Sequence, residues 1–348
     1  MNCCIVALMP ARPQPLAELT AIDREWFERE VVARGEPVVL RGLVAQWPAV
    51  KRGRESPEAI CRYLIERDNG APVDALLLGP EEKGRIFYNA AMDGFNFART
   101  RRPLAQVIEQ IARYSAFPVA PAVAAQSALI RDCLPRFLDE NPMPLLAAGV
   151  EPRIWLGNAI TVPAHFDDAN NIACVVAGRR RFTLFPPAQI ANLYIGPIDF
   201  APTGAPISLV DFANPDFERF PRFGEALSHA LSAELAPGDA IFIPPLWWHH
   251  VQSLEACNML VNYWWGGSAG VINDALAGFN CLNDALLTLR QLPATQRAAW
   301  AEVFAHYVFG DADEAVAHIP AERRGVLGKL NAEAIRERRA RLAAKLAT

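Results

Sequence analysis

Two short segments of the chain carry side chains that could together hold a metal ion. The first, TVPAHFDDANNIACVV, contains His165 and Asp167, and the second, GDAIFIPPLWWHHV, contains His249 and His250. Both segments are typical of strands, and residues two apart in a strand point to the same face. His165 and Asp167 can therefore direct two ligand atoms at one point.

A third ligand from a neighbouring strand would complete a set of two histidines and one carboxylate. Such a facial triad leaves three adjacent metal positions open, as a non-haem Fe(II) oxygenase requires. Three of the six histidines lie away from these strands: His229 in FGEALSHALSAEL, where a helix is predicted, and His306 and His318 in the mainly helical tail. Adjacent residues of a strand face opposite ways, so only one of His249 and His250 can point inward with His165. The pattern alone leaves both open.

The elements that must position these ligands are short strands. Between about residues 121 and 265, strand-like runs alternate with Gly, Pro and Asn, which indicates a β-sandwich or barrel. The proline-rich stretch 186–234 is too long for a plain connection, so we expect a structured insert near the site.

Helices are predicted on both sides of this β region. Upstream, the sequence predicts a helix over 15–35, a buried strand in GEPVVLRGLVAQWPAV, a helix over 56–68 with Ser56 as its N-cap, two strands in DALLLGPEEKGRIFYNA and a helix in PLAQVIEQIARYSA. Downstream, it predicts helices over 271–292, 295–309 and 331–346, the last basic and amphipathic. We therefore divide the chain into 1–120, 121–268 and 269–348, and expect a mainly β fold with flanking helices.

Composition restricts the class of protein. The 348 residues are 52% hydrophobic and 21% charged, as in a well-buried globular protein, and a net charge of −4 makes a nucleic-acid partner unlikely. No signal peptide or membrane span is predicted, and either Met1 or Met9 is expected to be the true start. Seven scattered cysteines without a CxxC pair predict free thiols and a cytoplasmic location. They are Cys3, Cys4, Cys61, Cys133, Cys174, Cys257 and Cys281.

Four ordered segments, PAHFDDANN, GRRRFTLFPP, PGDAIFIPPLWWHHVQSL and LVNYWW, resemble the cupin-like JmjC family of 2-oxoglutarate-dependent oxygenases. In motif terms they are most similar to the asparaginyl hydroxylase that acts on hypoxia-inducible factor. The likeness is continuous over about residues 120–265 and looser upstream. It implies a double-stranded β-helix, the cupin or jelly-roll barrel, buttressed by N-terminal helices. From the apolar spacing after residue 270 we also expect a helical C-terminal segment, which could support a homodimer.

The resemblance also implies what the barrel binds. The first histidine of the Trp-Trp-His-His run, His249, becomes the third metal ligand beside His165 and Asp167. Fe(II) is then the metal and 2-oxoglutarate the co-substrate. The reaction expected is oxidative decarboxylation of 2-oxoglutarate to succinate and CO₂, coupled to hydroxylation of an unactivated C–H bond.

Four further positions match co-substrate contacts of the family. Arg180 takes the place of the cation that binds the distal carboxylate, where relatives commonly carry lysine. Asn171 and Asn262 match positions that hydrogen-bond the co-substrate. Thr161 is a candidate hydroxyl, one residue away from the family position.

The sequence says least about the substrate. The tyrosine that the similar hydroxylase uses is replaced within VAAQS at 123–127. Candidate substrate contacts are Tyr88, Asn89, Gln126 and Trp248, and we expect a protein side chain or a small molecule to be modified. Two alternatives are a metal-dependent cupin enzyme that does not use 2-oxoglutarate and a non-catalytic cupin binding protein.

Overall fold

The computed structural model describes residues 12–114, 117–267 and 277–346. Two compact units make up the chain, residues 1–265 and 266–348. The three-part division at residues 120 and 268 stays a prediction.

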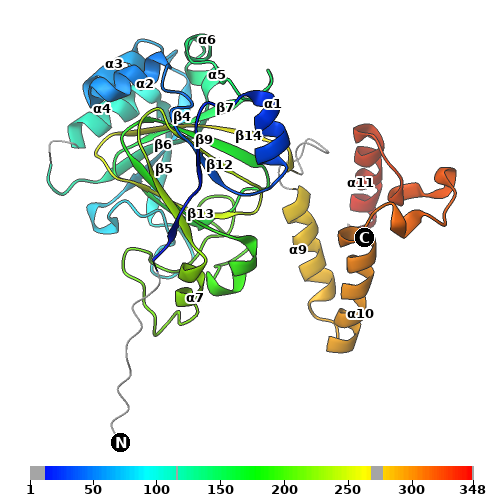
Figure 1. The fold of residues 1–348 in the computed structure, drawn as a ribbon. Coiled ribbons are helices and arrows are strands. Elements are labelled where there is room, and N and C mark those ends of the chain that lie inside the picture. The colour runs from blue at the N-terminus through cyan, green and yellow to red at the C-terminus, as the bar shows by residue number, and fades with distance from the viewer. Residues whose placement is uncertain (1–11, 115–116, 268–276, 347–348) are drawn as a thin grey trace, which may run out of the picture. The chain divides into compact units, whose positions relative to one another are not determined.

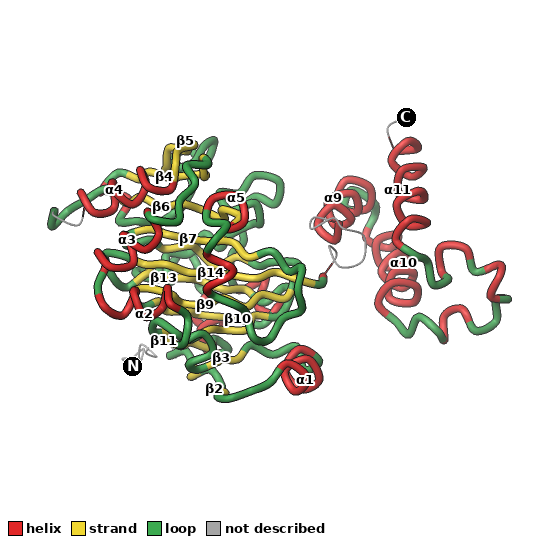
Figure 2. The backbone as a smooth tube through the Cα atoms, turned by 90° about the horizontal axis from the view of Figure 1, so that it is seen from above, coloured by secondary structure: helices red, strands yellow, loops and turns green. Residues whose placement is uncertain are grey.

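Two β-sheets face each other in the first unit, and most of their strand pairs are antiparallel (Figures 1 and 2). The larger sheet has the strand order β2 (Glu18–Leu19), β3 (Val38–Leu40), β12 (Ala240–Ile243), β9 (Asn170–Ala177), β14 (Asn258–Trp265), β7 (Pro152–Gly157), β6 (Ala122–Leu129), β4 (Pro72–Leu78), β5 (Phe97–Pro103). The smaller sheet has the order β1 (Gln14–Pro15), β11 (Leu231–Leu235), β10 (Arg180–Phe185), β13 (Trp248–Ser253), β8 (Thr161–His165). This arrangement is the predicted double-stranded β-helix, with flanking helices.

The central strands of the larger sheet are buried on both faces. In β9, Ile172, Cys174 and Val176 belong to the apolar cluster under the helices, whereas Ala173 and Val175 pack between the two sheets. The alternation of strand side chains thus sends each neighbour into a different core, which explains the unbroken apolar run NIACVV.

Helices cover the outer face of the larger sheet, as Figure 1 shows for α2 (Pro48–Glu55), α3 (Pro57–Ile65) and α4 (Leu104–Tyr114). The prediction for α3 is confirmed in detail, because the Ser56 hydroxyl accepts a hydrogen bond from the Ala59 N–H at 3.1 Å. Shorter helical segments complete this layer: α1 (Arg24–Trp26), η1 (Phe27–Val32), α5 (Ile130–Cys133) and α6 (Phe137–Glu140). A single helical turn, η2 (Pro80–Glu82), follows β4.

The proline-rich insert and the C-terminal region also have defined structure. The insert contains η3 (Pro187–Asn192) and α7 (Phe223–Ser228) around a small aromatic core. The second unit consists of α9 (Ala277–Leu289), α10 (Ala294–Phe304), η4 (Ala305–Phe309), η5 (Glu314–Val316), η6 (Ala321–Arg323), η7 (Gly325–Leu327) and α11 (Ala332–Leu346). The first six residues of the helix predicted over 271–292 lie outside the described residues.

Two of the predicted elements were wrong in part. The helix over 15–35 begins only at Arg24, because the chain before it pairs in parallel as β1 with β11 and as β2 with β3. In DALLLGPEEKGRIFYNA only the first strand forms. Its expected partner makes isolated bridges at Arg85 and Tyr88, and β5, downstream, pairs with β4 instead. Long-range pairing outweighs local preference in both places.

The described cysteines are free thiols: Cys61, Cys133, Cys174, Cys257 and Cys281. Cys3 and Cys4 lie outside the described residues. None of the helices in the described ranges combines the length and the apolar character that crossing a bilayer would take.

The contact between α2 and β9 depends on a glycine. A Cβ at Gly53 would overlap the backbone oxygen of Val176, so the helix could not lie as close to the sheet. We expect Gly53→Ala to lower the free energy of unfolding by about 1–3 kcal/mol, although alanine favours helix. In Gly224→Ala, a helical glycine of α7 with open space around it, we expect no loss. Urea unfolding measures both, and equal stability of the two variants would contradict this account of the packing.

Candidate metal centre

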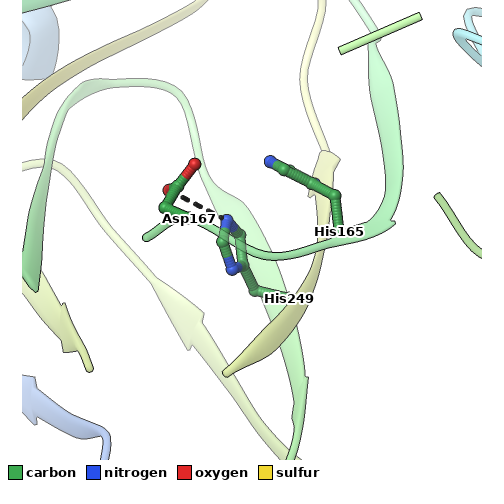
Figure 3. Close-up of side chains that lie close together, drawn as sticks. All are labelled: His165, Asp167 and His249. Carbon is green, nitrogen blue, oxygen red and sulfur yellow. Dashed lines mark ion pairs between the residues drawn. The ribbon is translucent and has the colours of Figure 1, made fainter. Parts of the chain in front are cut away.

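Three side chains from one edge of the smaller sheet converge on a point. β8 and β13 pair with His165 opposite His249, and Asp167 follows β8 by two residues. One ligand atom from each of the three lies within 4.8 Å of the others, and the two imidazole centroids are 4.2 Å apart. Figure 3 shows the three side chains turned toward one another, with His249 Nε2 3.5 Å from Asp167 Oδ2. In the described part of the chain this is the one such cluster of metal-binding side chains.

Backbone carbonyls fix which nitrogen of each imidazole is available. His165 Nδ1 lies 2.9 Å from the Pro163 carbonyl oxygen, and His249 Nδ1 lies 3.0 Å from that of Trp247. A protonated Nδ1 that donates to a carbonyl leaves the Nε2 lone pair free to bind a metal. Burial, together with the charge of His249, lowers the pKa of His165 to about 4, so this imidazole is neutral at neutral pH.

A chain of buried polar groups orients the carboxylate. Asp167 Oδ2 accepts hydrogen bonds from Asn171 Nδ2 at 3.2 Å and from Trp264 Nε1 at 3.0 Å. Asn262 Nδ2 donates to Asn171 Oδ1 at 3.4 Å, and Trp155 Nε1 donates to Asn262 Oδ1 at 2.8 Å. Strands β7, β9 and β14 of the opposite sheet thus hold Asp167 in place, which is the outer-shell support typical of metal ligands.

His249 and His250 face opposite ways, as strand geometry requires. The His250 ring stacks on Phe212 of the insert, with centroids 4.5 Å apart and planes at 17°. Burial is the main reason that its pKa falls to about 3. Of the two histidines that the sequence left open, His249 is the one turned toward His165 and Asp167.

The three side chains open into a cavity of about 240 Å³ between the sheets. Arg180 of β10 also lines it and is 7% exposed. Its Nε finds no hydrogen-bond acceptor among the residues that the structure describes. Desolvation lowers the pKa of Arg180 to about 10, which leaves the guanidinium charged at neutral pH. Its neighbours differ, because Arg179 and Arg181 are exposed and both form ion pairs with Glu234.

A β-bulge changes which residue of β8 enters the cavity. The pairing between β13 and β8 shifts register between His249 and Val251, so Val251 lies opposite Val162 and Gln252 opposite Thr161. Val162 and Val251 line the cavity, and Thr161 is not part of the lining. The expected hydroxyl at Thr161 is therefore replaced by the apolar side chain of Val162, which sequence alternation alone could not show.

A second bulge, in β6, shapes the far wall. Pairing of β6 with β7 shifts between Ala125 and Ala128, and the two residues between them, Gln126 and Ser127, both line the cavity. Ser127 has a left-handed backbone, with φ of 48°. Sequence reasoning identified Gln126 but not Ser127, because nothing in VAAQS marks the bulge. Further lining residues that it did not assign to the site include Asp74, Arg99, Trp155, Pro202 and Thr203.

Three of the substrate candidates lie outside the cavity lining. The Tyr88 hydroxyl donates to the Phe200 carbonyl at 2.7 Å. Asn89 donates to the Asp93 carboxylate at 2.8 Å. Trp248 is 2% exposed and packs in the aromatic core of the insert, since it faces the side opposite to His249. None of these three side chains lines the cavity.

Comparison with known proteins identifies relatives. Residues 24–270 match the Cupin-like domain family. The chain is 28% identical to Jumonji C domain-containing protein 5 of Drosophila melanogaster over 255 residues, 72% of this chain and 59% of that protein. It is 27% identical to lysine-specific demethylase JMJ31 of Arabidopsis thaliana over 278 residues, 71% and 48% of the two chains. It is 25% identical to tRNA wybutosine-synthesizing protein 5 of Gallus gallus over 328 residues, 84% and 95%.

Two facing sheets with a cluster of candidate metal-binding side chains at their cavity are the architecture of a cupin. Because the family match covers more than half of the chain, the protein belongs to the cupin-like JmjC family, and the resemblance carried by its four motifs is confirmed. The chain spans 59% of the fruit-fly relative and 48% of the Arabidopsis relative.

The opposite orientations of the two adjacent histidines give a direct test. We expect His249→Ala to weaken binding of Fe(II) or Co(II) by more than about 100-fold, because loss of an outer-shell partner alone costs about 10–100-fold. His250→Gln should stay within about threefold of wild type, provided that circular dichroism shows it folded. Anaerobic calorimetric titration measures both. A larger loss of metal affinity in His250→Gln than in His249→Ala would identify His250 as the third ligand.

Proposed function

We propose that this protein is an Fe(II)- and 2-oxoglutarate-dependent oxygenase, a dioxygenase that hydroxylates a C–H bond. The observation that carries the proposal is Arg180, a buried guanidinium without an acceptor for its Nε, in the same cavity as His165, Asp167 and His249. Leaving a buried cation without a counter-charge is costly, so the cavity favours an anionic ligand. A dicarboxylate in this cavity would pair with the cation at one end and with a metal held by the triad at the other.

The donor set suits the metal. Two imidazole Nε2 atoms and one carboxylate are the facial triad used by non-haem Fe(II) oxygenases, and His165, Asp167 and His249 would hold the ion. Bound together, Fe(II) and 2-oxoglutarate would supply the oxidising power: 2-oxoglutarate, O₂ and R–H yield succinate, CO₂ and R–OH.

The chain's own residues would orient and enclose these partners. Arg180 would bind the distal carboxylate through charge-assisted hydrogen bonds, in place of the lysine common in relatives. Apolar side chains of Val162, Phe182 and Val251 line the same cavity and would keep water away from the reacting centre. Asn171 and Asn262 would position Asp167, and either could also contact the co-substrate.

The substrate belongs to the proposal too. One relative is named a lysine-specific demethylase and another a tRNA wybutosine-synthesizing protein, so the names of relatives point to two different substrate classes. A protein side chain or a small molecule fits the net charge of −4 better than nucleic acid does. A cytoplasmic location, proposed from the free thiols, suits such substrates.

Arg180 and its neighbour Arg181 form a matched pair for testing the co-substrate. Arg180→Gln removes the buried cation, and we expect the KM for 2-oxoglutarate in succinate formation to rise by about 100-fold or more. Arg181→Gln removes an exposed cation that pairs with Glu234, and we expect a change below about twofold. Equal behaviour of the two variants, with iron still bound, would favour a metal-dependent cupin that does not use 2-oxoglutarate.

We also propose that the helices of the second unit form a homodimer. Within residues 277–346, only Ala315 and Val316 are buried. Leu287 is 82% exposed and Phe309 is 78% exposed, in a unit whose helices contribute almost no core of their own. Apolar surface of this extent is typical of a subunit interface.

Sedimentation equilibrium tests the dimer. We expect a wild-type dimer at micromolar concentration, and a monomer when Leu287→Glu and Phe309→Glu are combined, because two charges would be buried at the interface. Ile190→Glu, at a residue of the first unit that is 53% exposed, should leave the dimer intact. A monomeric wild type would rule out this assembly.

A further inference from the structure

One margin of the larger sheet is an open strand edge. β5 is the last strand in the order of that sheet and pairs with β4 on one side (Figure 2). No strand of the described part of the chain pairs with its other side. Ala98 through Arg101 are exposed. An edge of this kind offers backbone N–H and C=O groups to an added strand.

The register shows which backbone groups face outward. Pro72 of β4 lies opposite Pro103 of β5, and neither has an N–H, so these two residues cannot exchange hydrogen bonds with each other. Bonded and non-bonded pairs alternate along an antiparallel ladder. Arg102 is therefore bonded to β4, whereas Arg99 and Arg101 direct their N–H and C=O groups away from it.

The same two residues carry charge, and the face they share leads to the active cavity. Arg99 has no carboxylate within ion-pair distance among the described residues, and it lines the cavity together with Asp74. Arg101 lies 3.8 Å from Asp74, a loose pair with both side chains exposed. Arg102 projects to the opposite face, where it donates to Thr100 and to Gln110 of α4.

We propose that an extended acidic segment of a substrate protein adds to β5 as a further strand. Its backbone would hydrogen-bond to Arg99 and Arg101, and its carboxylates would meet their guanidinium groups. Alternate side chains of such a strand would point to the cavity face, on the side where Arg99 and Asp74 line it. The inference names the substrate class of the proposed oxygenase and rests on that function for its chemistry, but the docking itself requires neither metal nor co-substrate.

Arginines on an edge strand can have roles other than binding a peptide. Charges there also hinder unwanted pairing between sheets, and a basic strip attracts RNA as well as acidic peptides. A peptide is favoured over RNA because the outward N–H and C=O groups of Arg99 and Arg101 can pair with a peptide backbone. Binding by charge alone would use Arg102 as well as Arg99 and Arg101.

The test is fluorescence anisotropy on the full-length, metal-free protein. The probe is a fluorescein-labelled ten-residue peptide of alternating glutamate and threonine. We expect Arg99→Gln combined with Arg101→Gln to weaken its binding by about tenfold. Arg102→Gln, on the same strand but turned to β4 and to the opposite face, should change binding by less than about twofold. On the wild-type protein, the same peptide N-methylated at every residue should lose at least about tenfold, because it cannot donate to the edge.

Several results would overturn the proposal: no binding, undiminished binding of the N-methylated peptide, an equal loss in Arg102→Gln, or tighter binding of a twelve-nucleotide polyuridine. The N-methylated arm uses wild-type protein, so misfolding of a variant cannot mask the answer. Because the assay contains no metal, it can fail while the oxygenase chemistry stands, and the reverse also holds.

Discussion

The pairing of β8 with β13 is the constraint on which the site depends. It sets His165 opposite His249 across two neighbouring strands, and it holds both rings through backbone carbonyls two residues earlier. Asp167 joins them only because the chain leaves β8 directly after His165 and turns back as β9. The larger sheet supplies the polar side chains that orient the Asp167 carboxylate.

Buried polar groups form a hydrogen-bonded network on one wall of the cavity. Asp167, Asn171, Asn262 and two indole N–H groups satisfy one another, so the network is stable without a ligand. The Nε of Arg180 is the exception, since burial has removed its water and the described residues provide no acceptor for it. Under the proposed function, this unsatisfied cation would pair with an anion bound next to the metal.

Much of the fold could be predicted from the sequence because it follows from local sequence patterns. The short strands, the capped helix after Ser56 and the spacing of His165 and Asp167 follow from side-chain alternation and capping chemistry. The choice between His249 and His250 needed family resemblance, because both parities are possible in a lone strand. The bulges that bring in Val162 and Ser127 were not readable, since they arise from how two strands pair. The same holds for β5, whose arginines and threonine do not suggest a strand until β4 lies beside them.

The central claim is that one cavity holds Fe(II) and 2-oxoglutarate together. Its most direct test is anaerobic: Fe(II) is added to the metal-free protein, 2-oxoglutarate follows, and the visible spectrum is recorded for a metal-to-ligand charge-transfer band. The account predicts a band in the wild-type protein and none in His165→Ala. Iron that binds without producing a band would contradict chelation of 2-oxoglutarate at this centre.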